Sequence, residues 1–206
     1  MQPILIAPPA AEPVTLAEAR AWLRVDTNDE DAAIASLISA ARMLVESATR
    51  RALVTQGWRV MLDAWPAGGG EGGWSILTTR PSAAPSEIVI PLAPVQSVSA
   101  VRVYDAVGLP QTLALATYRL VGAPERARLV FLAQPPHPGA AAGGIEIDLV
   151  AGYGDPPDTP AALRHAILAL VSWWFDNRGD VASTDAGSLP PRAAALVAPF
   201  RRGRLA

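Results

Sequence analysis

The hydrophobic pattern of this chain changes period twice, and that change restricts the fold more than any motif does. Apolar residues recur at helical intervals of three and four between residues 29 and 49. From residue 55 they alternate at the interval of a strand, and the helical period returns at residues 159–177. We therefore predict the α+β class: a helical bundle core, made of two N-terminal helices plus C-terminal helices, with an antiparallel β-rich middle region.

The N-terminal part carries clear helix signals. Thr15-Leu16-Ala17-Glu18 matches a capping box, in which threonine and glutamate each satisfy a free backbone N–H, so a first helix is expected over residues 15–26. Acidic residues 29–31 suit the start of a second helix over residues 29–49. Its expected buried stripe consists of Ile34, Leu37, Ile38, Ala41, Leu44, Val45 and Ala48.

The middle of the chain shows strand-like segments separated by turns rich in proline and glycine. The first is expected at residues 55–63, where Trp58, Val60 and Leu62 alternate with polar or exposed positions. The others are expected at residues 75–79, 87–90, 98–104, 118–121, 128–132 and 145–150. This spacing predicts an antiparallel sandwich or a small barrel. Ile145 to Leu149 alternates strictly, so one face of that strand should meet solvent or a neighbouring subunit.

A third helix is expected over residues 159–177, with Thr159 as N-cap and Pro160 at the first helical position. Trp173 and Phe175 lie off the apolar stripe of this helix. These two side chains indicate either a helix buried on all sides or an apolar surface kept for a partner. A short fourth helix is expected around residues 192–198.

The predicted organisation is 1–53 for the N-terminal core helices, 54–152 for the β-rich region, 153–189 for the third helix and loop, and 190–206 for a docking tail.

The residue types give little support to catalysis. The chain has no cysteine and only two histidines, His137 and His165, neither of which has a second metal ligand at a useful spacing. The glycine-rich segment 68–73 is not followed by the lysine and hydroxyl residue of a phosphate-binding loop. We therefore predict no catalytic residues, no metal and no cofactor, and no enzymatic activity.

Charge and hydropathy restrict the partners. The formal net charge of −2 and pI near 5.7 argue against binding nucleic acid with the whole surface. The start of the chain lacks the pattern of a signal peptide, and no run reaches the roughly 18 apolar residues of a membrane span. The protein is expected to be cytoplasmic on synthesis, with no membrane partner.

The C-terminal tail is basic and partly apolar. Four arginines (Arg192, Arg201, Arg202 and Arg204) follow the last acidic residue, and the same segment contains the apolar Leu196, Phe200 and Leu205. Such a segment is typical of a short peptide that docks into an acidic groove. A solubilising end that frays and a nucleic-acid contact are the alternatives.

The order of these segments resembles the head-tail connector (adaptor) proteins of long-tailed phages and phage-like gene transfer agents, in particular the larger subfamily with a β-rich insertion. The resemblance is carried by Pro13 to Val25, by the helix from Asp31 to Arg42 that ends at Thr49-Arg50-Arg51, and by Ala151-Gly152-Tyr153-Gly154 leading into residues 160–170. The chain departs from the family where Arg50 replaces an expected glycine, so the helix ending is expected to be irregular. It departs again where Trp173-Trp174-Phe175 replaces the usual tyrosine.

The resemblance implies a ring, usually of twelve subunits, between the portal and the stopper or next connector, incorporated in the particle at the head-tail junction. Double-stranded DNA would pass through its lumen without sequence specificity. The portal-binding residues would be Arg192, Leu196, Phe200, Arg201, Arg202, Arg204 and Leu205. The subunit-interface residues would be Arg50, Arg51, Trp173, Phe175 and Arg178. The alternative is a small DNA-binding or ligand-binding module with helical flanks, with His165 as its candidate active residue.

Overall fold

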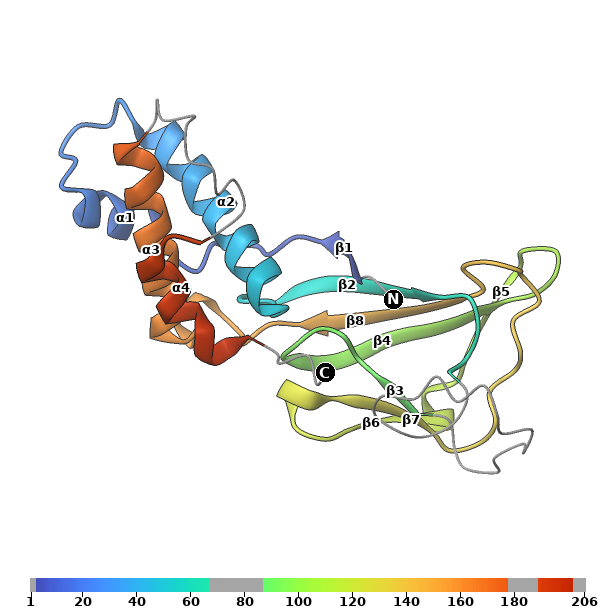
Figure 1. The fold of residues 1–206 in the computed structure, drawn as a ribbon. Helices are drawn as coiled ribbons and strands as arrows, with labels where there is room; N and C mark the ends of the chain where they lie inside the picture. The colour runs from blue at the N-terminus through green and yellow to red at the C-terminus, as the bar shows by residue number, and fades with distance from the viewer. Residues whose placement is uncertain (1–2, 67–86, 178–188, 202–206) are drawn as a thin grey trace. The chain divides into compact units, whose positions relative to one another are not determined.

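The computed structural model describes residues 3–66, 87–177 and 189–201. These residues form two compact units, each with its own hydrophobic core (Figure 1). Residues 9–55 and 153–201 make a helical unit, and residues 3–8 and 56–152 make a β unit. Since helices and antiparallel sheets are both present, the predicted α+β class is confirmed.

The helical unit contains four α-helices among the described residues. They are α1 (Leu16–Leu23), α2 (Asp31–Thr49), α3 (Ala161–Asp176) and α4 (Pro191–Val197), with short 3-10 turns η3 (Pro156–Asp158) and η4 (Ala198–Phe200). Helices α2 and α3 run antiparallel, and α1 and α4 flank α3 (Figure 1). Their apolar stripes meet in one core, whose fully buried members include Ile34, Val45, Leu163, Ile167 and Leu170.

Helix α1 begins as the sequence predicts. The Glu18 N–H donates to Thr15 Oγ1 at 3.1 Å, and the Thr15 N–H donates to Glu18 Oε2 at 2.8 Å, which completes the capping box. The helix ends at Leu23, three residues before the predicted end, because Arg24 takes the left-handed conformation with φ 58°.

Helix α2 is the main core helix of the unit. It begins at Asp31, two residues later than predicted, and ends at Thr49 as expected. Ile34, Ile38, Ala41 and Val45 are buried, while Leu37, Leu44 and Ala48 pack against the core at partial burial. By length and composition α2 alone among the described helices could cross a membrane. Its buried stripe packs in the helical core, as in any core helix of a folded domain.

The ending of α2 is regular despite the missing glycine. Arg50 takes the left-handed conformation with φ 54°, and its N–H donates to the Glu46 carbonyl. The expected irregularity is therefore wrong, because the arginine adopts the backbone angles that glycine adopts more easily.

Replacing Arg50 with glycine is expected to stabilise the chain. The left-handed conformation costs a non-glycine residue about 1 kcal/mol, so Arg50→Gly should raise the free energy of unfolding by about that amount. Ala40→Gly is the control, because a glycine at this exposed mid-helix position should lower it by about 1 kcal/mol. Urea unfolding of both variants measures the difference; a loss of stability in Arg50→Gly would contradict the account.

Helix α3 begins one residue later than the cap pattern predicts. Pro160 occupies the N-cap position, and Thr159 does not cap the helix. The Thr159 hydroxyl donates instead to the Leu53 carbonyl at 2.9 Å, so a tertiary hydrogen bond replaces the predicted local one. Phe175 packs against the core at partial burial and Trp173 is 49% exposed, so the helix is not buried on all sides. Use of the exposed Trp173 by a partner stays a prediction.

The β unit contains two antiparallel sheets. Its strands are β1 (Pro3–Ala7), β2 (Gln56–Leu62), β3 (Glu87–Val89), β4 (Val95–Tyr104), β5 (Pro110–Thr112), β6 (Tyr118–Val121), β7 (Arg128–Phe131) and β8 (Ile145–Ala151). The orders are β1-β2-β8-β4-β5 and β3-β7-β6. Among the strands of the described residues neither order closes on itself, which fits the sandwich alternative better than the barrel. Strands β1 and β5 were not predicted, and the expected strand at 75–79 and the loop 68–73 lie outside the described residues.

Strand β8 lies at the centre of the larger sheet, between β2 and β4. Its apolar face is buried, as expected, but Glu146 and Asp148 on the other face are buried as well. The expectation that the polar side chains of this face meet solvent is therefore wrong for the two carboxylates, and contact of this face with a neighbouring subunit stays a prediction. Arg59 of β2 and Arg102 of β4 reach over the two carboxylates and cover them.

Candidate functional site

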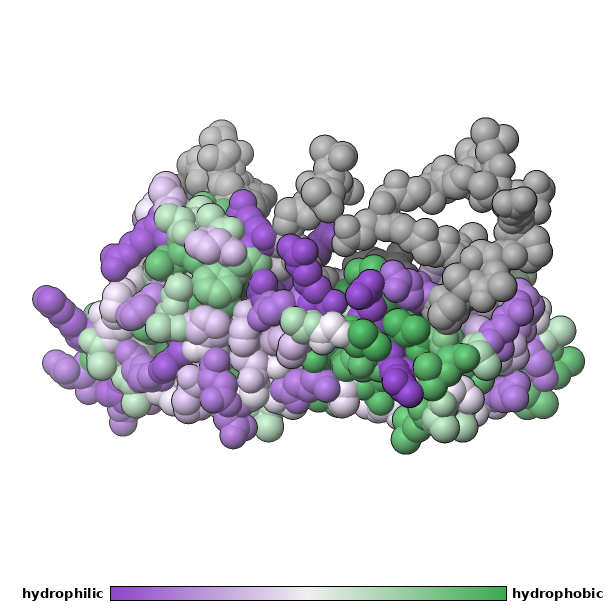
Figure 2. Space-filling model, turned by 90° about the horizontal axis from the view of Figure 1, so that it is seen from below, coloured by the Kyte–Doolittle hydropathy of each residue, from purple (hydrophilic) through white to green (hydrophobic). Residues whose placement is uncertain are grey.

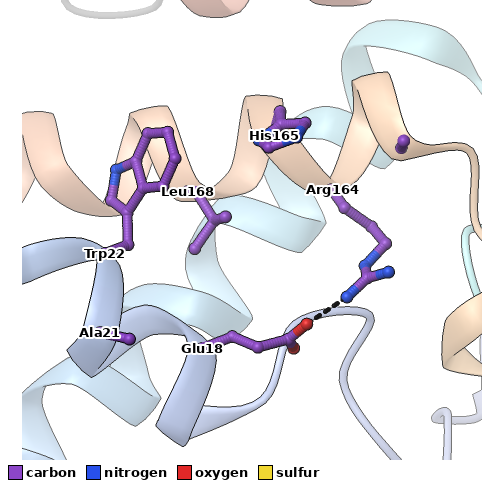
Figure 3. A pocket seen from close by; sticks show the side chains of 7 residues that line it. Glu18, Ala21, Trp22, Arg164, His165 and Leu168 are labelled. Carbon is purple, nitrogen blue, oxygen red and sulfur yellow. Dashed lines mark hydrogen bonds and ion pairs between the residues drawn. The ribbon is translucent and has the colours of Figure 1, made fainter.

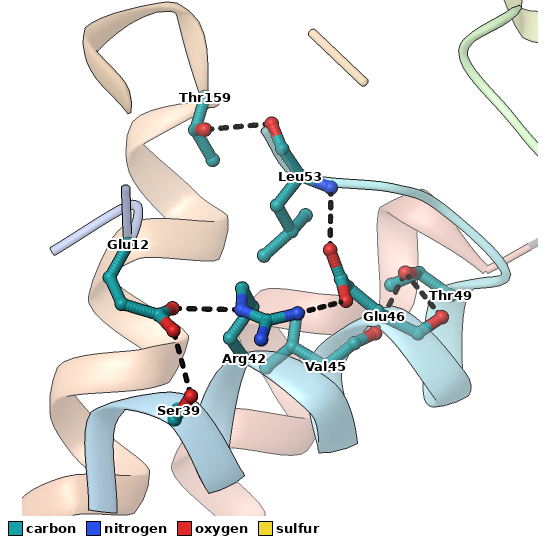
Figure 4. Close-up of polar contacts among 8 residues, drawn as sticks. All are labelled: Glu12, Ser39, Arg42, Val45, Glu46, Thr49, Leu53 and Thr159. Atoms are coloured by element: carbon teal, nitrogen blue, oxygen red, sulfur yellow. Dashed lines mark hydrogen bonds and ion pairs between the residues drawn. The ribbon is translucent and has the colours of Figure 1, made fainter. Parts of the chain in front are cut away.

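A buried polar cluster fixes the C-terminal end of α2 (Figure 4). The Arg42 guanidinium donates to Glu12 Oε2 and to Glu46 Oε2, both at 2.8 Å. Glu46 Oε1 accepts the Leu53 N–H at 2.9 Å, so the segment after the helix is held to its last turns. Arg42 and Glu46 are only 6% and 8% exposed. We call this set the Arg42 cluster.

Arg51 holds the base of the C-terminal tail. Its Nε donates to the Phe200 carbonyl at 2.9 Å, and its Nη1 donates to the Tyr153 hydroxyl at 2.9 Å. The guanidinium also lies 5.8 Å from the centre of the Phe200 ring, a cation–π distance. One arginine thus joins the end of α2, the segment before α3 and the end of the described tail.

The predicted portal-binding residues lie in two environments. Leu196 and Phe200 are partly buried against the helical core, whereas Arg192 and Arg201 are exposed. The Arg192 guanidinium lies over the Trp22 ring at 5.6 Å. The remaining three predicted residues, Arg202, Arg204 and Leu205, lie outside the described residues.

The predicted subunit-interface residues are also divided. Arg50 and Trp173 are exposed on the surface of the helical unit. Arg51 makes the contacts within the chain described above, and Phe175 packs against the core. Arg178 lies outside the described residues. Arg50 and Trp173 are therefore the two that the helical unit presents to solvent.

A groove runs along α3, between α1 and α4, and sequence analysis did not predict it. Its larger part has a volume of about 440 Å³ and is lined by Glu18, Trp22, Arg164, His165 and Leu168 among others (Figure 3). A second part of about 190 Å³ shares Trp22 and adds Ser172, Trp173, Asp176 and Arg192. We call the two parts the α3 groove. Two sequence signals pointed to it: Trp22 lies off the stripe of Leu16, Ala19 and Leu23, and Trp173 lies off the stripe of the third helix.

The polar groups of the α3 groove have structural partners. Glu18 accepts the Thr15 N–H and pairs with Arg164, and these contacts hold the pKa of Glu18 below its usual value, the Thr15 hydrogen bond contributing most. The carboxylate therefore stays ionised and is unsuited to act as a general acid at neutral pH. His165 is exposed and lies 5.8 Å from the Trp22 ring. Within the described residues, no group of histidines and acids could hold a metal ion.

The outer face of the larger sheet carries an ion-pair network. Arg59 contacts Asp148 through Nε at 2.6 Å and Nη2 at 3.0 Å, and Arg102 contacts Asp148 Oδ2 at 2.6 Å. Glu146 lies 3.2 Å from Arg59. Burial raises the pKa of Asp148, but the hydrogen bonds from the two arginines outweigh it, and the pKa is lowered. Because each arginine is matched by a carboxylate, this face has little net charge to attract DNA.

The β unit also exposes apolar side chains. Figure 2 shows hydrophobic residues gathered on one face of the molecule, over strands of this unit. The exposed large apolar residues of the smaller sheet and its connections include Val89, Leu115, Val121 and Leu132. Patches of this kind are typical of proteins that assemble with others.

The comparisons with known proteins agree with this picture of an assembly component. The family model for the phage gp6-like head-tail connector protein matches residues 13–92, which cover α1, α2, β2 and β3. Among curated protein sequences, none matches this chain.

Three solved structures match over the full length of the chain and over 98% of their own. They are the neck of an empty gene transfer agent (GTA) particle computed with C6 symmetry (28% identity, TM-score 0.78), the virion of a native GTA particle (29%, 0.76), and the neck of a native GTA particle computed with C12 symmetry (28%, 0.74). The chain therefore has the fold of a virion neck protein. The predicted resemblance to the head-tail connector family of phages and gene transfer agents is confirmed.

Proposed function

We propose that twelve copies of this chain form a ring at the neck of a phage-like particle, between the portal and the stopper or next connector, and that DNA passes through the ring. The observation that carries the proposal is the match over the full chain to neck structures, one of them computed with C12 symmetry. The role is structural, and no catalytic step is assigned to it.

The charges of the chain favour a ring that lets DNA pass through over a ring that binds DNA tightly. The net charge is −2, and the buried Arg42 and the partly exposed Arg59 and Arg102 are each paired with a carboxylate. A lumen that neutralised many phosphates would hold DNA tightly, because released counterions drive such binding. A ring also stabilises modest subunits by mass action, since binding a neighbour favours the folded state.

The proposed portal contact is the C-terminal tail. The Arg51 contacts with Phe200 and Tyr153 hold the base of the tail on the helical unit. The exposed Arg192 and Arg201 are therefore attached to a segment whose position on this unit is fixed. Together with Arg202 and Arg204 they would pair with acidic groups of the portal, and Leu205 and the exposed part of Phe200 would add apolar contact.

The tail is best tested by reversing charge, because deletion from Arg192 onward would also remove Ala193 and Val197 from the core. We expect Arg201→Glu/Arg202→Glu to weaken portal binding at least tenfold in a pull-down with purified portal protein. Arg119→Glu/Arg126→Glu is the control with the same charge change at exposed positions of the β unit. Equal portal binding by the two double variants would refute the tail as the contact.

The ring is tested in the native cell. The tagged protein is purified at moderate salt, its partners are identified by mass spectrometry, and the particles are imaged by electron microscopy. Enrichment of portal and tail proteins, with density for a twelvefold ring at the neck, is the expected result. Recovery of metabolic enzymes, or of promoter DNA whose binding falls steeply with salt, would overturn the proposal in favour of a ligand-binding or DNA-binding module.

A further inference from the structure

The α3 groove is the strongest candidate for an unassigned binding site on the helical unit. Only three large hydrophobic side chains are exposed among the described residues of this unit: Trp22, Met43 and Trp173. Two of them, the tryptophans, line the groove together with Arg192. Tryptophan and arginine in a concave apolar setting are the residues that most often dominate a protein interface.

The third exposed residue, Met43, belongs to α2, none of whose residues lines the α3 groove. The inner face of α2 packs in the core, and its outer face carries Met43, 61% exposed, among small side chains. These small residues are Ala33, Ser36, Ala40 and Ser47. The unit therefore has a concave apolar surface on α3 and a convex one on α2, with a flexible methionine protruding from the latter.

Each subunit of a cyclic ring needs two complementary surfaces, one for each neighbour. Neighbouring subunits in a ring meet through two different faces, so a groove on one side must be matched by a projection on the other. We propose that the outer face of α2 in one copy docks into the α3 groove of the next copy, with Met43 entering the part lined by Trp22, His165 and Leu168. This inference rests on the proposed ring and names its subunit contact.

The symmetry of the ring fixes the direction of the docked helix. Rotation to the next of twelve subunits turns a helix by at most about 30°, so α2 of the neighbour keeps nearly the direction of α2 in the first copy. Within one copy α2 and α3 are antiparallel, since Leu53, just after α2, bonds to Thr159, just before α3 (Figure 1). The docked α2 must therefore run antiparallel to α3.

The charges along the two helices agree with this direction. In the antiparallel arrangement the exposed Arg50, at the end of α2, approaches Glu18 at the start of the groove. The exposed Asp29, just before α2, approaches Arg192 at the other end. The lengths also match, because 19 and 16 residues of helix span about 28 Å and 24 Å. With the helix centres aligned, Ser36 faces Ser172 and Met43 faces His165.

The absence of cysteine from the chain permits a direct test by cross-linking. In the assembled ring, Ser36→Cys/Ser172→Cys should link neighbouring subunits under mild oxidation and give a ladder of covalent oligomers. Ser47→Cys/Ser172→Cys is the matched control, because Ser47 lies about 16 Å further along α2 and should remain unlinked. Linking of the control pair instead, or of neither pair, would overturn the antiparallel docking.

A surface variant provides a second measurement. Met43→Glu alters an exposed side chain, so the fold should persist while ring assembly, measured by mass photometry or in purified particles, falls at least tenfold. Val107→Glu, at an exposed position of the β unit, should assemble normally. Rings that form equally well with Met43→Glu would refute this contact and leave the ring intact as a proposal. Absence of rings from the wild-type particles would refute the ring itself.

Discussion

Replacing Glu46 with leucine should lower the free energy of unfolding by about 3–5 kcal/mol, because it breaks a buried ion pair and leaves one partner behind. The carboxylate is 8% exposed and accepts hydrogen bonds from the Arg42 guanidinium and the Leu53 N–H. Leucine removes both contacts. Arg42 then keeps Glu12, and the Leu53 N–H loses its side-chain acceptor in a buried setting.

Matched variants separate the charge from the hydrogen bond. Glu46→Gln keeps an oxygen that can accept the Leu53 N–H, so its loss should be smaller, about 1–2 kcal/mol. The double variant Arg42→Leu/Glu46→Leu should recover part of the loss of Glu46→Leu, because it no longer buries an incompletely paired charge. Ser47→Ala, on the exposed side of the same helix, should change stability by no more than about 0.5 kcal/mol.

Urea unfolding followed by far-UV circular dichroism measures these differences, since the signal is dominated by the helices. A loss below about 1 kcal/mol for Glu46→Leu would show that the Arg42 cluster does not stabilise the helical unit. Equal losses for Glu46→Leu and the double variant would show that the buried charge of Arg42 is not the cause.

The helices could be predicted from sequence because their signals are local. The capping box of Thr15 and Glu18 and the stripe of α2 involve residues three or four apart, and the structure keeps both. Two errors were local, because Arg24 and Arg50 take the left-handed conformation without being glycine. Another came where a distant partner competes with a local signal. Thr159 is a good N-cap residue, but its hydroxyl binds the carbonyl of Leu53, 106 positions earlier.

Strand β1, the covered face of β8 and the α3 groove were not predicted because each depends on residues far apart in the sequence. Strand β1 is a short apolar segment that starts at a proline, and only its pairing with β2 makes it a strand. The polar face of β8 was expected at a surface because alternation does not show that Arg59 and Arg102 on neighbouring strands will cover it. The α3 groove combines Trp22 with residues more than 130 positions away, so no local pattern contains it.

Replacing Asp148 with asparagine should lower the stability of the β unit by about 2–3 kcal/mol at neutral pH. The carboxylate is 7% exposed and receives hydrogen bonds from both Arg59 and Arg102, so the amide leaves two guanidinium groups short of a full charge partner. The two arginine side chains are each 29% exposed, and this access to water limits the loss. Gln111→Glu, an exposed change on the edge strand β5, is a control that should have little effect.

The pH dependence of the stability difference between wild type and Asp148→Asn distinguishes the effect of the Asp148 charge from the effect of side-chain packing. The pKa of Asp148 is lowered in the folded chain from its ordinary 3.8, because the hydrogen bonds from Arg59 and Arg102 outweigh burial. The carboxylate therefore stabilises the fold fully above that ordinary value, and the stabilisation is lost as the pH falls through the lowered pKa. The difference in free energy of unfolding between wild type and Asp148→Asn should stay constant from pH 7 to about 4 and shrink below it.

Hydrogen exchange of a peptide containing β8 measures this stability difference for the β unit separately. A gap that persists unchanged at pH 2 would mean that the asparagine disturbs packing and that the ion pairs contribute little.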